Sequence, residues 1–218
     1  MLLLAFDTAT PAITVALHDG AHVLAESTTV DARRTGELLA PGITAVLTAA
    51  GRKPGELTGV AVGVGPGPFT GLRVGLVTAR ALGDALGIPV HGVCTLDVVA
   101  YQSESAEPFA VATDARRKEV YWAQYTDYLT RSTEPDVAHP TLIAERLAGL
   151  QVAGEGALLY PEAFPKAIAP RHPSAAALAE LTIKRLQSDP DSLLFPEPLY
   201  LRRPDAVEPG TRKRVSTS

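Results

Sequence analysis

Two aspartates stand at corresponding places in the sequence and could hold a metal-bound nucleotide. Asp7 follows the apolar run that begins at Leu2, and Asp114 follows a second apolar run that begins at Phe109. After each aspartate come a few residues and another strand-like run, so the pattern of strand, aspartate, turn and strand occurs twice and hints at an internal duplication. Across a cleft, paired carboxylates could hold Mg²⁺-bound water for nucleotide hydrolysis or phosphoryl transfer. Each carboxylate could equally accept backbone N–H groups of its own turn.

A glycine-rich loop over residues 63–75 has the layout of a phosphate loop but lacks its chemistry. A Walker loop needs Lys-Ser/Thr after its second glycine, whereas Gly71 is followed by leucine and arginine. Pro66 and Pro68 also remove two N–H groups that would otherwise face an anion. The sequence therefore predicts a loop that serves shape more than phosphate binding.

His18 and His22 have the spacing of a helical metal pair, but they flank the turn signal Asp19-Gly20. A two-residue hairpin turn would pair His18 with Ala21 and direct His22 to the other face. No third ligand is evident nearby, so we expect no metal site here.

Composition excludes several classes of protein. The chain has 218 residues, 46% of them hydrophobic, and a net charge of −4, so it lacks a global positive field for nucleic acid. Cys94 is the single cysteine, which rules out a disulfide framework, and its place at the end of an apolar strand predicts simple packing. The N-terminal apolar run is too short for a signal segment and no run has the length of a membrane span, so we expect a cytosolic protein.

The first part of the chain reads as three strands, a helix, a strand, a helix and a strand. The expected ranges are 2–6, 13–17, 23–29, 35–50, 60–64, 72–86 and 90–93, with Pro41 either kinking the first helix or starting its main part. This order is that of a ribonuclease-H-like α/β domain with a mixed sheet flanked by helices.

A second unit begins near Pro108. Strands are expected over 109–113, over 119–125 and near Val152, with helices over 141–150 and 174–187 and Ser174 as an N-cap. We therefore divide the chain into an N-terminal lobe over 1–105, a smaller C-terminal lobe over 106–190, and a return segment with a basic tail over 191–218.

Small residues recur every four positions along the second helix, at Gly71, Gly75, Ala79, Gly83 and Gly87. On a helix this spacing makes a nearly straight groove with little side chain in it. Each interior glycine costs about 1 kcal/mol relative to alanine. Close approach of another backbone would offset the cost, and that backbone belongs either to a partner protein or to this domain's own sheet or first helix.

Charges are scarce on both helices. After Glu37 the first helix has none until Arg52, and the second carries only Arg73, Arg80 and Asp84. A surface helix normally has a wide polar face, so the helix pair predicts a protein–protein surface. The expected interface residues are Leu38, Leu39, Ile43, Val46, Leu47, Gly71, Leu72, Gly75, Leu76, Ala79 and Gly83.

Two basic segments have open interpretations. Arg116 and Arg117 lie in a charged turn, which is either a solvated hairpin tip or a contact with a domain or partner. In the tail, Arg202, Arg203, Arg212, Lys213 and Arg214 outnumber the acidic residues, which fits either a solvated end or an RNA contact.

Four segments together resemble the TsaB (YeaZ) family. They are Asp7-Thr-Ala-Thr10, Gly65-Pro-Gly-Pro-Phe-Thr-Gly-Leu-Arg73, Asp114-Ala-Arg-Arg-Lys-Glu-Val-Tyr-Trp122 and Pro198-Leu-Tyr-Leu-Arg-Arg-Pro-Asp-Ala206, and they span nearly the whole chain. Pro68 departs from the family's usual serine, and Arg34-Thr35 lacks the histidine often found before that threonine.

The resemblance implies two actin/Hsp70-like lobes and a non-catalytic subunit required for threonylcarbamoyl transfer to adenosine 37 of tRNAs that read codons beginning with A. Such a subunit binds and activates the catalytic paralogue TsaD through its first two helices and works with the ATPase TsaE and the threonylcarbamoyl-adenylate synthase. It forms a homodimer when alone, meets tRNA only through the complex, and has no cofactor of its own. Whether ATP or ADP binds at the interface of the complex stays open.

In TsaD, the segment equivalent to Val93–Ala100 carries a metal-binding His-x-x-x-His. Here the two ligand positions hold Thr95 and Val99, so the resemblance implies no metal and no catalysis. Two enzymatic alternatives remain: an ATP-dependent kinase or ATPase of the actin-like fold that uses Asp7 and Asp114, and the peptidase activity historically attached to this superfamily. Missing metal ligands and a missing nucleophile speak against the peptidase.

Overall fold

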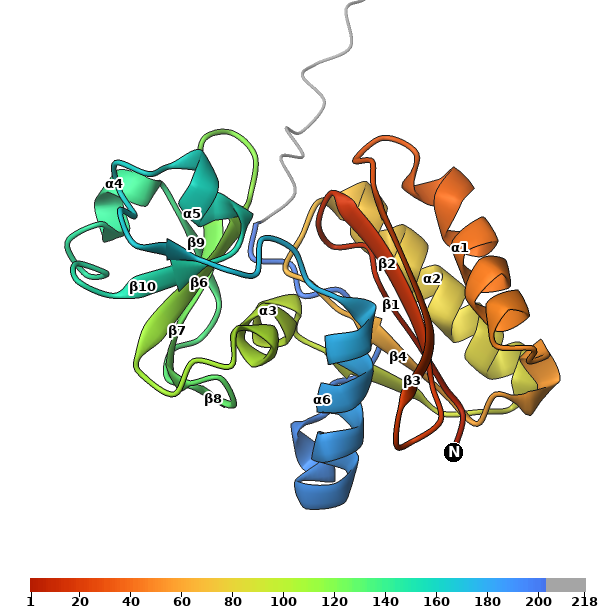
Figure 1. The fold of residues 1–218 in the computed structure, drawn as a ribbon. Coiled ribbons are helices and arrows are strands. Elements are labelled where there is room, and N and C mark those ends of the chain that lie inside the picture. Colours follow the sequence, from red (N-terminus) through yellow and green to blue (C-terminus); the bar gives the residue numbers. More distant parts are fainter. Residues whose placement is uncertain (203–218) are drawn as a thin grey trace, which may run out of the picture.

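The computed structural model describes residues 1–202, which form two α/β lobes joined through a central pair of helices (Figure 1). Each lobe is built on one mixed sheet. The basic tail expected beyond Arg202 lies outside the described residues. Within the described part, none of the helices combines the length and apolar character needed to cross a membrane.

The first sheet has the strand order β3-β2-β1-β4-β5. β1 (Leu3–Asp7) pairs antiparallel with β2 (Ala12–His18) and parallel with β4 (Gly59–Gly63), while β3 (Val23–Val30) and β5 (Val90–Val93) are the edges. Every residue of β1, β2 and β4 is buried, because helices cover both faces of this sheet.

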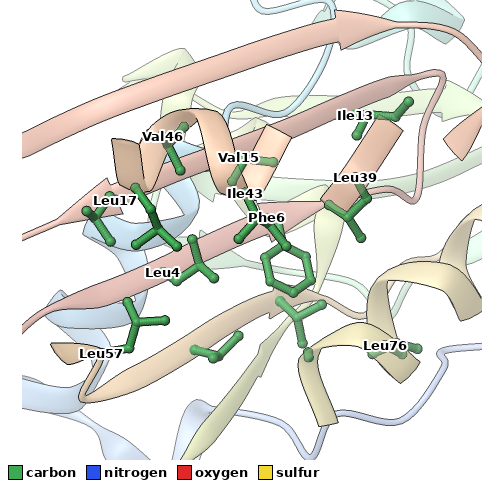
Figure 2. Close-up of a cluster of buried hydrophobic side chains, with 14 of the residues drawn as sticks. Leu4, Phe6, Ile13, Val15, Leu17, Leu39, Ile43, Val46, Leu57 and Leu76 are labelled. Atoms are coloured by element: carbon green, nitrogen blue, oxygen red, sulfur yellow. The ribbon is translucent and has the colours of Figure 1, made fainter. Parts of the chain in front are cut away.

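One face of the first sheet is covered by α1 (Thr35–Ala49) and α2 (Phe69–Leu86), which lie side by side (Figure 1). Between α1 and β4 lies a short 3₁₀ turn, η1 (Pro54–Glu56). The helix α1 begins at Thr35, so Pro41 lies inside it and does not start its main part. Pro41 is exposed. In Figure 2, Leu39 and Ile43 of α1 lie near Phe6 and Val15 of the sheet.

The second sheet repeats the first. Its strand order is β11-β10-β6-β7-β8, with β9 also paired to β7, and β6 is antiparallel to β7 and parallel to β10. β6 thus occupies the place of β1, and the duplication expected from the aspartate pattern is confirmed. The strands are β6 (Phe109–Asp114), β7 (Val120–Asp127), β8 (Thr130–Arg131), β9 (Asp136–Ala138), β10 (Gln151–Ala153) and β11 (Ala167–Ile168).

The lobes exchange their last helices. α3 (Thr95–Ser103) follows the first sheet but packs Leu96 and Val99 against the second, whereas α6 (Ala175–Ser188) follows the second sheet and packs Leu178 against the first. Figure 1 shows both helices in the middle of the molecule. In the sequence, the strands of the first sheet end at Val93 and those of the second begin at Phe109. Each sheet nevertheless completes its core with a helix from the other lobe's stretch of chain.

The helices expected in the second unit agree with the structure only in part. Ser174 is the N-cap of α6, since its Oγ accepts a hydrogen bond from the N–H of Ala177 at 3.2 Å. The helix expected over 141–150 is wrong: only α4 (Pro140–Ile143) is helical, and turns follow it. Neither α3 nor α5 (Glu155–Leu159) was expected. Residues 95–100 of α3 are buried in succession and α5 has only five residues, so neither segment shows a helical period.

The return segment begins with η2 (Pro190–Ser192). The chain then returns to the first lobe, where the N–H of Leu199 donates to the carbonyl of Val64 at 2.9 Å.

Candidate functional site

Asp7 is enclosed at the centre of the first lobe. Its side chain is fully buried, Oδ1 accepts the N–H of Ala9 at 2.7 Å, and Oδ2 accepts the hydroxyl of Thr95 at 2.7 Å. Burial raises the pKa of this carboxyl, and the two hydrogen bonds oppose the rise. A carboxylate without solvent contact cannot hold metal-bound water in this structure.

The glycine loop after β4 holds Asp7 in place. At Gly63, a Cβ would lie 1.8 Å from Oδ2 of Asp7, so only glycine fits against the carboxylate. The N–H of Gly65 donates to the Thr95 hydroxyl at 3.2 Å, and the N–H of Thr95 donates to the carbonyl of Gly65 at 2.7 Å. The loop thus joins β1, β4 and α3, which agrees with a role in shape.

Asp114 makes the matching contact in the second lobe. Its Oδ1 accepts the N–H of Arg116 at 2.9 Å, just as Asp7 accepts the N–H two residues on. Both aspartates therefore stabilise their own turns. The hypothesis of two carboxylates facing a common metal is wrong for Asp7, which reaches no cleft. Over residues 1–202, no group of three or more His, Cys, Asp or Glu side chains could hold a metal ion.

The hairpin after β2 also differs from expectation. His18 pairs with Val23 and not with Ala21, so the loop contains four residues. The buried His18 accepts the N–H of Gly20 at its Nδ1 (2.9 Å), while the side chain of His22 is exposed. The two histidines do not converge.

Positions implied for the metal ligands of TsaD lie at the start of α3. Thr95 is buried and bonded to Asp7, and Val99 packs in the core of the second lobe. A hydroxyl engaged with a carboxylate and an aliphatic side chain do not fit a metal ion. Nearby, burial raises the pKa of the Cys94 thiol to about 12, which disfavours the thiolate form.

The turn after β1 packs against the stripe of small residues on α2. A Cβ at Gly71 would lie 2.6 Å from the carbonyl oxygen of Thr8, and one at Gly75 would lie 2.4 Å from the Thr8 hydroxyl. The same hydroxyl donates to the carbonyl of Gly71 at 2.8 Å. Farther along, a Cβ at Gly83 would meet Val90 of β5 at 2.4 Å. The groove is filled from within, and the idea that it receives a partner helix is wrong.

Most of the expected interface residues belong to the first lobe's core (Figure 2). Only Leu38 and Gly71 are half-buried; the buried ones are Leu39, Ile43, Val46, Leu47, Leu72, Gly75, Leu76, Ala79 and Gly83. The apolar period correctly identified the faces of α1 and α2 that avoid water. It did not reveal that β1, β2 and β4 of the same chain cover those faces.

The opposite side of the helix pair is exposed. On α1 it carries no charge after Glu37, whereas on α2 the exposed Arg73, Arg80 and Asp84 lie beside its apolar residues. We call it the outer face: Ala40, Pro41, Thr44, Ala45, Thr48 and Ala49 of α1, with Val77, Ala81 and Ala85 of α2. Val77 is 66% exposed. Sequence reasoning missed these residues, although the lack of charge between Glu37 and Arg52 on every side of α1 was the signal for them.

A cavity of about 310 Å³ lies between the lobes. The loop before α2, the turn after β6 and the return segment contribute its walls. Its lining residues are Gly67, Pro68, Phe69, Ala115, Arg116, Arg117, Tyr121, Tyr200, Leu201 and Arg202. Asp7 and Asp114 are not among them.

Two lobes with the same strand order, each with an aspartate at the end of its first strand, define an α/β protein of the actin/Hsp70-like class. Residues 22–186 match the family model of TsaD, tRNA N6-adenosine threonylcarbamoyltransferase. TsaB of Escherichia coli, a tRNA threonylcarbamoyladenosine biosynthesis protein, is 35% identical over 174 residues, covering 71% of this chain and 69% of that protein. The chain belongs to the TsaB (YeaZ) family.

Two further relatives cover nearly the whole chain. An uncharacterized protein of Mycobacterium tuberculosis is 46% identical over 209 residues, which is 94% of this chain and 93% of the relative. The structure of YeaZ from Pseudomonas aeruginosa superposes with a TM-score of 0.77 and 29% identity, over 92% of this chain and 99% of that one.

Proposed function

We propose that this chain is a non-catalytic subunit for threonylcarbamoyl transfer to adenosine 37 of tRNAs that read codons beginning with A. It acts by binding and activating the catalytic paralogue TsaD. Similarity to TsaB supports the pathway, and the residue types at the ligand positions, Thr95 and Val99, support the lack of catalysis. Such a role would place the chain with its tRNA in the cytoplasm.

The outer face is the observation that carries the proposal. Small side chains such as Ala45 and Ala81 let the backbone of a second helix pair come close, because the distance between packed helices depends on the side chains at the contact. Few ions have to be desolvated, since Arg73, Arg80 and Asp84 are the charges on this stretch of α2 and α1 has none after Glu37. We expect the equivalent helices of TsaD to pack here.

The same surface serves two further states of the assembly. Without TsaD, two copies of the chain pair through their outer faces, because a two-fold axis brings the same apolar surface of both copies together. TsaE joins once the TsaB–TsaD pair exists, and any ATP or ADP binds at the interface of that complex. The alternative of an ATPase based on Asp7 and Asp114 has no observation in its favour, since Asp7 is enclosed.

The test is co-purification with TsaD after charges are placed on the outer face. Ala45→Arg on α1 and Val77→Asp on α2 should each abolish TsaD binding and, with TsaE and the synthase present, threonylcarbamoyladenosine formation measured by nucleoside mass spectrometry. Leu142→Asp is the matched control, because Leu142 is an apolar residue 79% exposed on α4 of the other lobe. It should bind and function as the wild type does.

Thermal unfolding of each variant shows that the fold is intact, as exposed substitutions usually change stability by less than about 0.5 kcal/mol. If both outer-face variants are folded, bind TsaD and support modification, the proposed interface is wrong. If the wild-type chain itself does not bind TsaD, the proposed function falls.

A further inference from the structure

The cavity between the lobes shares no lining residue with the outer face and does not include the enclosed Asp7, although Tyr200 also lines a groove that reaches Val77. One wall is the loop Gly67–Phe69 before α2, the facing wall is the turn 115–117 with Tyr121, and Tyr200–Arg202 close one side. Its volume of about 310 Å³ is at the lower end for small-ligand pockets, so it admits one flat ring system and excludes a duplex.

Positive groups surround this cavity. Arg116, Arg117 and Arg202 line it, and Lys118 is the next exposed residue of the turn. Acidic side chains lie beside two of these arginines. The guanidinium of Arg116 lies 3.6 Å from the carboxylate of Asp114, and Arg202 donates a hydrogen bond to Glu119.

The N-terminus of α2 adds to the positive potential. The helix begins at Phe69, its N-cap Pro68 offers no side-chain hydrogen bond, and its first turn has no acidic residue. Among the described residues, the first N–H groups of this 18-residue helix therefore have no side-chain acceptor, and a helix N-terminus favours an anion.

Two aromatic rings complete the cavity. Phe69 and Tyr200 are stacked with their centroids 5.5 Å apart, yet Phe69 remains 50% and Tyr200 40% exposed. The guanidinium of Arg73 lies 3.7 Å from the centroid of Phe69, and its Nε donates to the Tyr200 hydroxyl at 2.8 Å. Arginine-braced aromatic rings beside cations are what single-stranded nucleic acids bind, by base stacking and phosphate contacts.

We propose that this interlobe cavity binds a single-stranded nucleotide of RNA, which in the proposed function is a nucleotide of the tRNA substrate. The base stacks on Phe69 and Tyr200, and the phosphate contacts Arg116 and the start of α2. The carboxylates of an acidic peptide would satisfy the arginines but have no ring to place on the aromatic pair.

The test measures RNA binding by the full chain through fluorescence anisotropy, with unmodified tRNA and with a single-stranded anticodon-loop oligonucleotide. Tyr200→Ala should weaken both affinities about fivefold or more through lost stacking. Arg116→Gln should weaken them and lower the slope of log K against log salt by about 1. The matched controls are Phe195→Ala, an aromatic ring 84% exposed outside the cavity, and Arg52→Gln, an exposed arginine of the first lobe. Both should bind RNA within about twofold of the wild type.

Three results would overturn the inference: no RNA binding by the wild-type chain, equal losses in cavity and control variants, or binding of free AMP but not of the oligonucleotide. The same variants are tested for TsaD co-purification, which Tyr200→Ala and Arg116→Gln should retain. A chain that binds TsaD but never RNA removes this inference and leaves the proposed function standing. A chain that binds RNA normally but does not bind TsaD would remove the proposed function and leave RNA binding by the cavity standing.

Discussion

Arg185 of α6 donates a hydrogen bond of 2.9 Å to Asp97 of α3, and this contact joins the two helices that the lobes exchange. The same carboxylate accepts the hydroxyl of Tyr125 at 2.9 Å and the guanidinium of Arg131 at 2.8 Å. Asp97 is buried, so it collects donors from α6, β7 and β8 at a point where both sheets are near. The two lobes are therefore coupled by a polar cluster as well as by packing.

Asp97→Ala should lower the free energy of unfolding by about 3 kcal/mol, because it leaves Arg131 and Arg185 without their carboxylate. This is the low end of the usual range, since both arginines keep some solvent contact. Urea denaturation followed by circular dichroism measures the effect. Asp191→Ala, an exposed aspartate, is the control and should change stability by less than about 0.5 kcal/mol. Equal stability of the two variants would show that the cluster does not couple the lobes.

Gly75→Ala should destabilise the chain although alanine is the better helix former by about 1 kcal/mol. Its Cβ would lie 2.4 Å from the Thr8 hydroxyl, and such overpacking costs about 1–3 kcal/mol. In a Thr8→Ala background the hydroxyl is gone and the next Thr8 atom is 3.6 Å away, so the same substitution should become neutral or stabilising.

A double-mutant cycle in urea measures this coupling between Gly75 and Thr8. Gly36→Ala in α1 is the matched control, because its Cβ would meet nothing within 4 Å. Additive effects of Gly75→Ala and Thr8→Ala would mean that the turn after β1 does not fill the groove of α2.

Asp7→Asn should change how stability depends on pH. Burial raises the pKa of Asp7 in the folded chain above 3.8, so the unfolded chain releases this proton first. Its contribution to stability is therefore complete below pH 3.8 and is lost as the pH rises through the folded-state pKa.

Asparagine does not titrate, so its contribution does not change with pH. Between pH 3.8 and the folded-state pKa of Asp7, the free energy of unfolding of the variant should therefore rise relative to that of the wild type by about 1.4 kcal/mol for each pH unit. Urea unfolding of both proteins from pH 4 upward gives the difference directly. A difference that stays constant with pH would show that Asp7 does not carry a raised pKa.

Cys94 should be unreactive in the native chain. The thiol is 1% exposed and its pKa is raised to about 12, so at pH 8 only about one molecule in ten thousand carries the thiolate. Ellman's reagent should release thionitrobenzoate slowly from the folded chain and rapidly, one per chain, in concentrated urea. Rapid reaction under native conditions would mean that the start of α3 opens easily.

The candidate site shows where sequence reasoning stopped. The weakness of Asp7 and Asp114 as a metal pair was visible in the neighbouring loop, which lacks phosphate-binding glycines, but the bond from Thr95 to Asp7 was not. Those two residues are 88 positions apart, and nothing local marks a hydroxyl as the partner of a distant carboxylate. The cavity was also invisible in the sequence, because Phe69, Arg116 and Tyr200 are far apart in the chain and come together only in the tertiary structure.

By itself, the sequence determined the duplicated order of strands, the faces of α1 and α2 that avoid water, and the N-cap at Ser174. These depend on periodicity and on contacts within a few residues, which single-chain patterns encode. Only the tertiary structure decided what the stripe from Gly71 to Gly83 faces, because a groove without side chains fits its own turn as well as a foreign helix. The exchange of α3 and α6 was decided in the same way. Apolar helices that connect two sheets can pack on either, and the choice depends on which surface the rest of the fold leaves uncovered.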